Sequence, residues 1–379
     1  MNRIPRIAIS HGDINGIGYE VILKAFEDGR LAELCTPVLF GSAKILNFYK
    51  KLLGLNTQYN VIQTPEEARD GILNVINIVS EDCKIEPGIS TETAGEAAYQ
   101  SLEAAVGALK DGTVDALVTA PINKFNIQSE NFHFPGHTEF LEAAAGDGYK
   151  SLMILNDENI RVALVTTHLP ISKIADNITE DLIVDKIAAF NKSLHSDFAI
   201  HHPRIGVLSL NPHVGENGLL GSEENDIIIP AINKARQMRI QVFGPYAADG
   251  FFGSGQFKKF DGILAMYHDQ GLAPFKTIAM DSGVNFTAGL PWVRTSPDHG
   301  TGYDIAGQGQ ADPQSFVSAI YEAIDVWRNR MRDDEAHRHP LKRQYYDKGD
   351  KGDKNDKSLR ADKNNADSAK STNQNNEQI

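Results

Sequence analysis

Three histidines each stand just after an apolar run that predicts a short buried strand. The pairs are Arg161–Val165 with His168, Arg204–Leu210 with His213, and Gly262–Met266 with His268. Because ligands of open α/β sheets bind beyond the carboxyl ends of the strands, three imidazoles could converge there. Three protein ligands with open coordination positions are typical of catalytic rather than structural metal sites. Imidazole nitrogen favours Zn, Co, Ni or Mn over a pure Mg site.

These histidines lie too far apart along the chain to form a local metal-binding motif. The pattern therefore predicts either a metal site that the fold or two subunits must assemble, or three unrelated loop residues. Asp269 and Lys276 follow His268 in the same segment, so that a metal and an anion could be bound side by side. Gly271, which stands between them, is expected to form a turn.

A further segment, Pro135–Leu141, carries groups suited to an anion. His137 and Thr138 precede an apolar helix start, where side chains and free amides can hold an anionic group. The alternative, which the pattern favours, is that Thr138 caps the helix. Lys124 follows another apolar run, Asp115–Thr119, and faces either a phosphate or the solvent.

Asn285 and Arg294 flank an apolar turn, and a guanidinium can grip a phosphate or carboxylate with two parallel hydrogen bonds. The glycine-rich loop that follows, Gly302–Pro313, lacks strand or helix periodicity, and a ligand would order it. A second glycine-rich segment, His11–Glu20, opens the first predicted helix. It is not a dinucleotide fingerprint, because Val21 occupies the place of the third glycine. A phosphate loop and a tight strand-to-helix turn explain it equally well.

Short apolar runs alternate with helical patterns along most of the chain. Strands are predicted at Arg6–Ser10, Pro37–Phe40, Val75–Val79, Asp115–Thr119, Ser151–Leu155, Arg161–Val165, Arg204–Leu210, Ile240–Phe243 and Gly262–Met266. Helices are predicted at Tyr19–Glu27, Ala43–Leu53, Thr93–Leu109, Thr179–Ser193, Ser222–Met238 and Ser315–Arg332. The alternation is typical of an α/β fold with a largely parallel sheet. Thr179 is expected to cap its helix, and Pro313 to begin the last one.

Composition excludes several classes of protein. A chain of 379 residues suffices for two domains or one large α/β domain. Its net charge of −13 argues against nucleic-acid binding, which needs a basic face, but not against a small anionic substrate. No apolar run approaches the ~20 residues of a membrane span, and no signal peptide is evident. With two cysteines only, a cytoplasmic location is expected. The polar stretch 347–379 predicts a disordered tail.

Six segments together resemble the 4-hydroxythreonine-4-phosphate dehydrogenase family of vitamin B6 biosynthesis. They are Pro135-Gly-His-Thr-Glu-Phe, Thr167-His-Leu-Pro, Leu210-Asn-Pro-His-Val-Gly-Glu, Gly244-Pro-Tyr-Ala-Ala-Asp, Met266-Tyr-His-Asp-Gln-Gly-Leu and Gly289-Leu-Pro-Trp-Val-Arg-Thr-Ser-Pro-Asp-His-Gly-Thr. They occur in order between Ile7 and Arg328. The loop Asp298–Pro313 also resembles the cofactor loop of isocitrate and isopropylmalate dehydrogenases.

The resemblance implies the fold of those dehydrogenases, with two α/β/α domains, a mixed and largely parallel sheet, and an active site in the interdomain cleft at a dimer interface. A discontinuous nucleotide-associated domain is expected at residues 1–130 plus 285–335. A metal, substrate and dimerisation domain is expected at residues 131–284. The implied partner is a second copy of the chain, with His268 contributed across the interface, and neither nucleic acid nor membrane is expected to bind.

The resemblance also implies roles for individual residues. The metal, a divalent Zn, Co, Mn or Mg ion, would be held by His168, His213 and His268. The substrate would contact His137, Thr138, Lys276, Asn285 and Arg294. NAD would lie against His299, Gly300, Thr301, Asp304, Gly307 and Asp312. Asp249 and Lys276 are the expected catalytic residues, and Asp249 or a metal-bound water would take the substrate's hydroxyl proton.

The implied reaction is the NAD- and metal-dependent oxidation of 4-phosphohydroxy-L-threonine, followed by decarboxylation to 3-amino-2-oxopropyl phosphate on the way to pyridoxal 5'-phosphate. The sequence departs from the family pattern at two places that are expected to lie beside the substrate. Ile14 and Asn15 replace a proline and an alanine, and the residues Ala273–Phe275 before Lys276 differ slightly from the family sequence. They keep open a sister dehydrogenase that acts on threonate or erythronate 4-phosphate. A transferase of the phosphate acetyltransferase type and a non-enzymatic sensor of metal and nucleotide are the remaining alternatives.

Overall fold

The computed structural model describes residues 3–80 and 82–338, and those up to His337 form one compact unit. The strands are β1 Arg6–Ser10, β2 Thr36–Gly41, β3 Tyr59–Ile62, β4 Leu73–Asn77, β5 Ala116–Thr119, β6 Leu152–Asp157, β7 Ile160–Leu164, β8 Arg204–Leu208, β9 Gln241–Tyr246, β10 Gly262–Ala265, β11 Val284–Ala288 and β12 Val293–Pro297. The α-helices are α1 Gly18–Ala25, α2 Ala43–Leu53, α3 Glu92–Lys110, α4 His137–Ala145, α5 Ile174–Asn177, α6 Glu180–Ser196, α7 Ile229–Gln237, α8 Ala248–Gly253, α9 His268–Ala279 and α10 Gln314–Arg338. The tail predicted at 347–379 lies outside the described residues.

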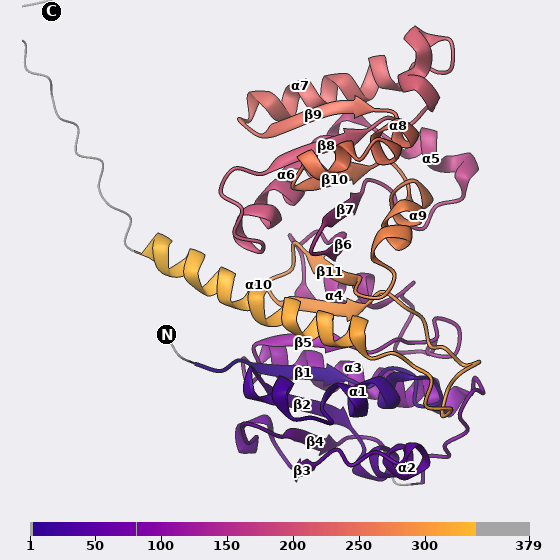
Figure 1. The fold of residues 1–379 in the computed structure, drawn as a ribbon, viewed down its shortest axis with the longest axis vertical. Coiled ribbons are helices and arrows are strands. Elements are labelled where there is room, and N and C mark those ends of the chain that lie inside the picture. The colour runs from indigo at the N-terminus through magenta and orange to yellow at the C-terminus, as the bar shows by residue number, and fades with distance from the viewer. Residues whose placement is uncertain (1–2, 81, 339–379) are drawn as a thin grey trace, which may run out of the picture. The chain divides into compact units, whose positions relative to one another are not determined.

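The described strands form one 12-stranded sheet in the order β3-β4-β2-β1-β5-β12-β11-β6-β7-β10-β8-β9 (Figure 1). Neighbours are parallel from β3 to β12 and again from β7 to β9. Between these two groups, β11 and β6 pair antiparallel with their neighbours, so that the groups run in opposite directions. The prediction of a mixed, largely parallel α/β sheet is confirmed. The division into two domains stays a prediction, since strands of both segments join this one sheet.

Helix boundaries follow the local signals in the sequence. The Thr179 side chain accepts a hydrogen bond from the amide of Leu182 and so caps α6 as predicted. Asp312 Oδ1 accepts from the amide of Gln314 at 2.8 Å, and Pro313 leads directly into α10. α10 packs against β12, where the Thr295 hydroxyl donates to the carbonyl of Ala319. None of the described helices is long and apolar enough to cross a membrane.

The turn predicted at Gly271 is wrong, because this glycine lies inside α9. A Cβ atom at Gly271 would stand 2.8 Å from Cγ1 of Val162 on β7. The glycine is therefore required for the close packing of α9 on the sheet rather than for backbone freedom. As a consequence, His268 is the first residue of a helix and Lys276 lies two turns further along it.

The helix predicted at Ser222–Met238 is irregular at its start. It opens with a single π-helical segment, η5 Glu224–Ile228, before α7 begins. Such segments are rare and occur mostly next to functional sites. The preceding segment, η4 Pro212–Gly218, carries His213 and is irregular as well.

The first glycine-rich segment is a buried structural turn rather than a phosphate loop. All residues from His11 to Glu20 are buried, and a Cβ at Gly18 would stand 2.2 Å from the carbonyl oxygen of His11. The amide of Ile17 donates to the carbonyl of Thr301 at 2.9 Å. The segment therefore supports the distant loop Asp298–Pro313 instead of a ligand.

Candidate functional site

A pocket of about 290 Å³ lies over four neighbouring strands, β5, β12, β11 and β6, where the strand direction changes. We call it the central pocket. Its polar and charged lining residues are Thr119, Lys124, His137, Thr138, Glu139, His168, Lys276, Asn285, Arg294, Ser296, Asp298 and His299. The five residues predicted to contact a substrate, and one of the three predicted metal ligands, are thus gathered in one place. Elements separated by more than 170 residues supply them.

Arg294 is the most deeply buried charge of the central pocket, with 3% of its surface exposed. Its Nε and Nη2 donate to the Thr119 hydroxyl at 3.2 and 2.6 Å, and Nη1 donates to the Thr287 hydroxyl at 3.0 Å. These partners are neutral, so they orient the guanidinium without balancing its charge. Burial accordingly lowers the pKa of Arg294 to about 9. Two of its five N–H donors remain for a ligand, and an anion would supply the missing negative charge.

Four buried polar atoms of the central pocket have no hydrogen-bond partner: His137 Nε2, Glu139 Oε2, Asn285 Oδ1 and His299 Nε2. Buried polar groups are almost always paired, so four such atoms around one cavity indicate a polar ligand. Burial and then the positive charges of Arg294 and Lys124 hold the pKa of His137 well below its usual value. His137 is therefore a neutral hydrogen-bonding group at pH 7.

The alternative role considered for Thr138, a helix cap, is not observed. α4 begins at His137 with Gly136 as its N-cap residue, and no side chain caps it. Thr138 instead lines the central pocket. Lys124 lines it too, which favours the ligand-facing alternative over a surface role.

Lys276 and Asp298 form a charged pair at one side of the central pocket. The ammonium of Lys276 lies 3.3 Å from Oδ1 of Asp298 and donates to that residue's carbonyl oxygen at 3.2 Å. Burial raises the pKa of the Asp298 carboxyl, although the charge of Lys276 opposes the shift. A lysine and a carboxyl group of raised pKa in contact can hold or transfer a proton.

Two of the predicted metal ligands lie together. The rings of His168 and His268 have centroids 6.2 Å apart and are tilted by 40°. Nδ1 of His268 lies 2.7 Å from Asp269 Oδ1, and Nδ1 of His168 lies 3.7 Å from Glu139 Oε1. Zn–N bonds are about 2 Å long, so two imidazoles on one ion have centroids about 5–6 Å apart. At 6.2 Å the observed pair lies just outside this range, so the two rings would have to approach each other slightly to share one divalent ion.

The third predicted ligand is not part of this group. His213 is exposed, does not line the central pocket, and follows β8, which is separated from β7 by β10. Within residues 3–80 and 82–338, no three His, Cys, Asp or Glu residues come close enough together to hold a metal ion. His268, which was expected from a second subunit, instead stands beside His168 in the same chain.

The residues predicted to bind NAD lie along one loop but differ in environment. His299 and Gly300 line the central pocket, whereas the Thr301 carbonyl accepts the amide of Ile17. Asp304 is exposed, and Asp312 caps α10. Gly307 adopts a φ of 73°, which favours glycine.

Both ends of this loop are fixed by the N-terminal part of the chain. Nζ of Lys24 donates to the carbonyls of Gly309 and Ala311 at 2.9 and 2.6 Å and to Glu20 Oε1 at 2.9 Å. The same Glu20 oxygen accepts the amide of Ala311. At the other end, the Tyr303 hydroxyl donates to Asp13 Oδ2 at 2.7 Å. The loop is therefore ordered by the protein alone, contrary to the expectation that a ligand is required.

Asp249, the expected base, lies outside the central pocket. It is exposed in α8, and its Oδ1 accepts the neighbouring amide of Gly250. It follows β9, and His213 follows the adjacent parallel strand β8. Asp249 and His213 therefore share one edge of the sheet, apart from the residues of the central pocket.

The two departures from the family pattern do not reach the central pocket either. Ile14 and Asn15 are fully buried, and neither lines the pocket. Oδ1 of Asn15 accepts the amide of Glu86, and Nδ2 donates to the carbonyl of Ile89. Ala273–Phe275 do not line the pocket. That these positions lie beside the substrate stays a prediction, and it does not agree with a substrate bound in the central pocket.

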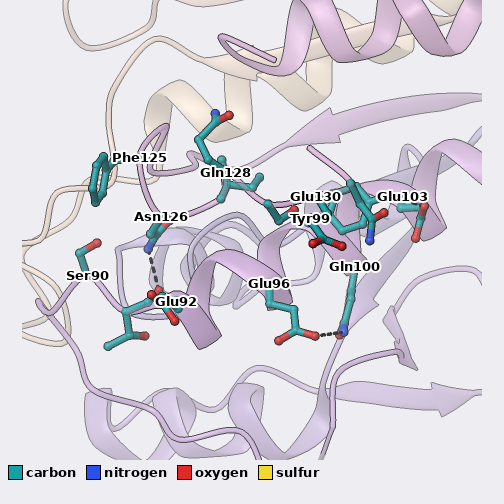
Figure 2. Close-up of a pocket in the computed structure, with 14 residues that line it drawn as sticks. Ser90, Glu92, Glu96, Tyr99, Gln100, Glu103, Phe125, Asn126, Gln128 and Glu130 are labelled. Carbon is teal, nitrogen blue, oxygen red and sulfur yellow. Dashed lines mark hydrogen bonds between the residues drawn. The ribbon is translucent and has the colours of Figure 1, made fainter. Parts of the chain in front are cut away.

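A larger hollow of about 850 Å³ lies between α3 and the segment that follows β5 (Figure 2). Its lining includes Glu92, Glu96, Glu103 and Glu130, together with Phe125, which is 85% exposed. No lysine, arginine or histidine is among the lining residues. Because an anionic ligand would meet only negative charge there, the smaller central pocket is the better candidate for the functional site.

Several residues of the central pocket, among them Glu139, Asp298 and Thr119, were not singled out from the sequence, and neither was Thr287, which contacts Arg294 from outside the pocket lining. Glu139 and Asp298 stand inside segments that were recognised, and their types alone could have marked them as candidates. Thr119 and Thr287 could not have been identified, because their contact with Arg294 depends on strand order. β12 pairs with both β5 and β11 and so places Arg294 between these two hydroxyls.

Comparisons with known proteins identify the family of the chain. The family model described as "Pyridoxal phosphate biosynthetic protein PdxA" matches residues 33–323. The 4-hydroxythreonine-4-phosphate dehydrogenase of Bacteroides thetaiotaomicron is 55% identical over 343 residues, which are 90% of this chain and 94% of that protein. The D-threonate 4-phosphate dehydrogenase of Cupriavidus necator is 38% identical over 326 residues, 85% of this chain and 97% of that protein.

Among solved structures, that of 4-hydroxythreonine-4-phosphate dehydrogenase from Klebsiella pneumoniae aligns with a TM-score of 0.76 and 34% identity. The alignment covers 86% of this chain and 99% of that one. Both the family model and these relatives span nearly all of the described sheet. The chain therefore belongs to the family of the pyridoxal phosphate biosynthetic protein PdxA.

Proposed function

We propose that this protein oxidises 4-phosphohydroxy-L-threonine with NAD and decarboxylates the product to 3-amino-2-oxopropyl phosphate, as a step in pyridoxal 5'-phosphate biosynthesis. The relative that is 55% identical carries the name of this dehydrogenase. The observation in the structure that carries the proposal is the buried guanidinium of Arg294, which faces a polar cavity and donates its described hydrogen bonds to hydroxyl groups rather than to a carboxylate. A phosphorylated, carboxylated substrate supplies the missing negative charge.

The central pocket can bind and orient such a substrate. Arg294 and Lys276 would hold its anionic groups, while neutral His137, Thr138 and Asn285 would hydrogen-bond its polar atoms. The ammonium group of Lys276 lies beside the carboxyl group of Asp298. It could donate a proton to the substrate carbon from which CO2 has departed. NAD, bound along Asp298–Pro313, would accept the hydride.

His168 and His268 would hold a divalent metal ion, and we propose that His213 of the partner subunit completes the site in a homodimer. A divalent ion lowers the pKa of a bound hydroxyl group and stabilises negative charge on oxygen. Ile171, close to His168 in the chain, is 81% exposed, and Leu219, close to His213, is 79% exposed. Such apolar side chains are typical of a surface that a second subunit covers. Asp249 follows β9, which pairs in parallel with β8, so the partner subunit would contribute Asp249 to the site together with His213.

The test is NADH formation from 4-phosphohydroxy-L-threonine, followed by absorbance, with and without a chelator. We expect turnover that the chelator abolishes and that Zn, Co or Mn restores. D-Threonate 4-phosphate should be the poorer substrate by kcat/KM. A preference for it would support the sister activity, which two of the relatives carry in their names. The absence of NADH formation with either compound would contradict the proposal.

The anchored loop gives a further prediction for the nucleotide. Replacing Lys24 by methionine removes three hydrogen bonds that fix Gly309, Ala311 and Glu20. We expect the KM for NAD to rise about tenfold, which corresponds to about 1.4 kcal/mol, with kcat nearly unchanged. Steady-state kinetics at saturating substrate measure both constants, with the exposed Lys110→Met as the control. An unchanged KM would show that this loop does not bind the nucleotide.

A further inference from the structure

The histidines that face each other beside the central pocket have similar surroundings. In each case Nδ1 is the ring atom nearest to a carboxylate: His268 Nδ1 lies at hydrogen-bond distance, 2.7 Å, from Asp269 Oδ1, whereas His168 Nδ1 lies at ion-pair distance, 3.7 Å, from Glu139 Oε1. A carboxylate at Nδ1 favours the tautomer in which Nδ1 carries the proton. The lone pair of Nε2 is then free, and Nε2 is the atom that can bind a metal ion.

Glu139 is well placed for this role by its backbone. It lies in the first turn of α4, where a negative charge interacts favourably with the helix dipole. Its Oε1 lies 3.7 Å from His168 Nδ1, while its Oε2 is buried and has no hydrogen-bond partner. The carboxylate is therefore kept in the central pocket without a neutralising hydrogen-bond network of its own.

We propose that Glu139 is a positioning residue that orients the His168 ring and fixes Nε2 as its metal-binding atom. This inference rests on the proposed role of His168 as a metal ligand. It assigns to Glu139 an effect on the metal that is exerted through His168, not by direct coordination. The side chain of Glu139 is 35% exposed, so its replacement by glutamine should leave the fold intact.

The test compares metal binding by the purified full-length dimer of four proteins: wild type, Glu139→Gln, Glu139→Asp and Glu96→Gln. Titration calorimetry with Zn²⁺, in the absence of substrate and NAD, gives the dissociation constant and stoichiometry. Loss of an orienting partner typically weakens metal affinity 10- to 100-fold. We expect Glu139→Gln to bind one Zn²⁺ per site with an affinity about 10- to 100-fold weaker than that of wild type. The affinity of Glu139→Asp should lie between those of Glu139→Gln and wild type.

Glu96 is the matched control, because it is a glutamate on α3 in the larger hollow, where it accepts a hydrogen bond from Gln100. Glu96→Gln should bind Zn²⁺ as wild type does. The absorption spectrum of the Co²⁺-loaded enzyme provides a second readout. A shifted spectrum in Glu139→Gln at saturating Co²⁺ would support a changed ligand orientation.

Three results would overturn the inference. Zn²⁺ affinity equal to wild type in Glu139→Gln would show that the carboxylate does not act on the site. Complete loss of binding, as in His168→Ala, would make Glu139 a direct ligand instead. Absence of Zn²⁺ binding by wild type would remove the metal role itself. Because no substrate is present, a wild type that binds Zn²⁺ yet forms no NADH contradicts only the proposed reaction.

Discussion

Replacing Arg294 by methionine is expected to abolish turnover and at the same time to raise the melting temperature. The guanidinium is 3% exposed and its hydrogen-bond partners are hydroxyl groups. The charge of the Glu139 carboxylate offsets only part of the cost of this burial. Depression of its pKa from the usual arginine value to about 9 corresponds to an unfavourable contribution of several kcal/mol at neutral pH. A methionine of similar length removes this contribution and keeps most of the packing.

Activity should fall by at least about a thousandfold in kcat/KM, since an anionic substrate would lose its buried cationic partner. Thermal unfolding without ligand measures the other effect, and a rise of a few degrees is expected. Arg330→Met is the matched control. Arg330 donates from Nε to the buried carboxylate of Asp197 at 2.6 Å, so its loss leaves an unpaired charge and should lower the melting temperature.

The difference in stability between wild type and Arg294→Met should change with pH in a definite direction. The folded-state pKa of Arg294 lies below its unfolded value, so the charge is destabilising at every pH below about 9. As the pH rises above about 9, the folded protein loses the proton before the unfolded chain does, and the stability deficit of wild type relative to Arg294→Met shrinks. A melting temperature of Arg294→Met below that of wild type at pH 7 would contradict the assigned imbalance of charge.

The second prediction concerns the shared metal site. Alanine at His168, His213 or His268 should each abolish turnover, while leaving the fold intact. Mixtures of two inactive variants, refolded together at equal concentration, reveal which histidines share a chain. His213→Ala mixed with His268→Ala should recover about a quarter of wild-type activity, because half of the dimers are mixed and each has one intact site.

The decisive mixture is His168→Ala with His268→Ala. These two residues lie side by side in one chain, so both sites of a mixed dimer should be defective and no activity should return. Recovery in this mixture would restore the arrangement expected from the sequence, in which His268 crosses the interface. No recovery in either mixture would indicate that a single chain assembles the site. NADH formation and bound metal per dimer are measured in each case.

The elements of the fold were largely predictable, because burial on both faces leaves an apolar run at each parallel strand. The runs before His168, His213 and His268 all became strands, β7, β8 and β10. The order of these strands was not predictable from the runs themselves, since pairing depends on contacts that are distant in sequence. That order brings two of the imidazoles together, because β7 and β10 are neighbours. β8 also pairs with β10, but His213 lies in the irregular segment Pro212–Gly218 that follows it and does not join them.

The residues predicted to bind the substrate also show how far prediction from the sequence could go. His137, Lys276 and Arg294 were identified by their types and by the segments around them, and all three line the central pocket. The segment around His213 was not predictable in its conformation, because four non-glycine residues there adopt positive φ. Local preference disfavours that conformation by about 1–2 kcal/mol per residue, so tertiary contacts must impose it. Glu224 contributes, accepting the amides of Leu210 and Asn211.

The hydrogen bonds that fix both ends of the loop Asp298–Pro313 also affect how the chain folds. These bonds connect Asp13, Glu20 and Lys24 with the loop that follows β12. The bonded residues are separated by 285 to 291 positions in the sequence. Loop closure over such separations is slow, and a chain emerging from the ribosome cannot make these contacts until its final helix is nearly complete. The loop proposed to bind the nucleotide is therefore among the last parts to become ordered. A nascent or truncated chain that has not reached Tyr303 leaves the Asp13 carboxylate without the Tyr303 hydroxyl, and one that has not reached Ala311 leaves Glu20 without the Ala311 amide.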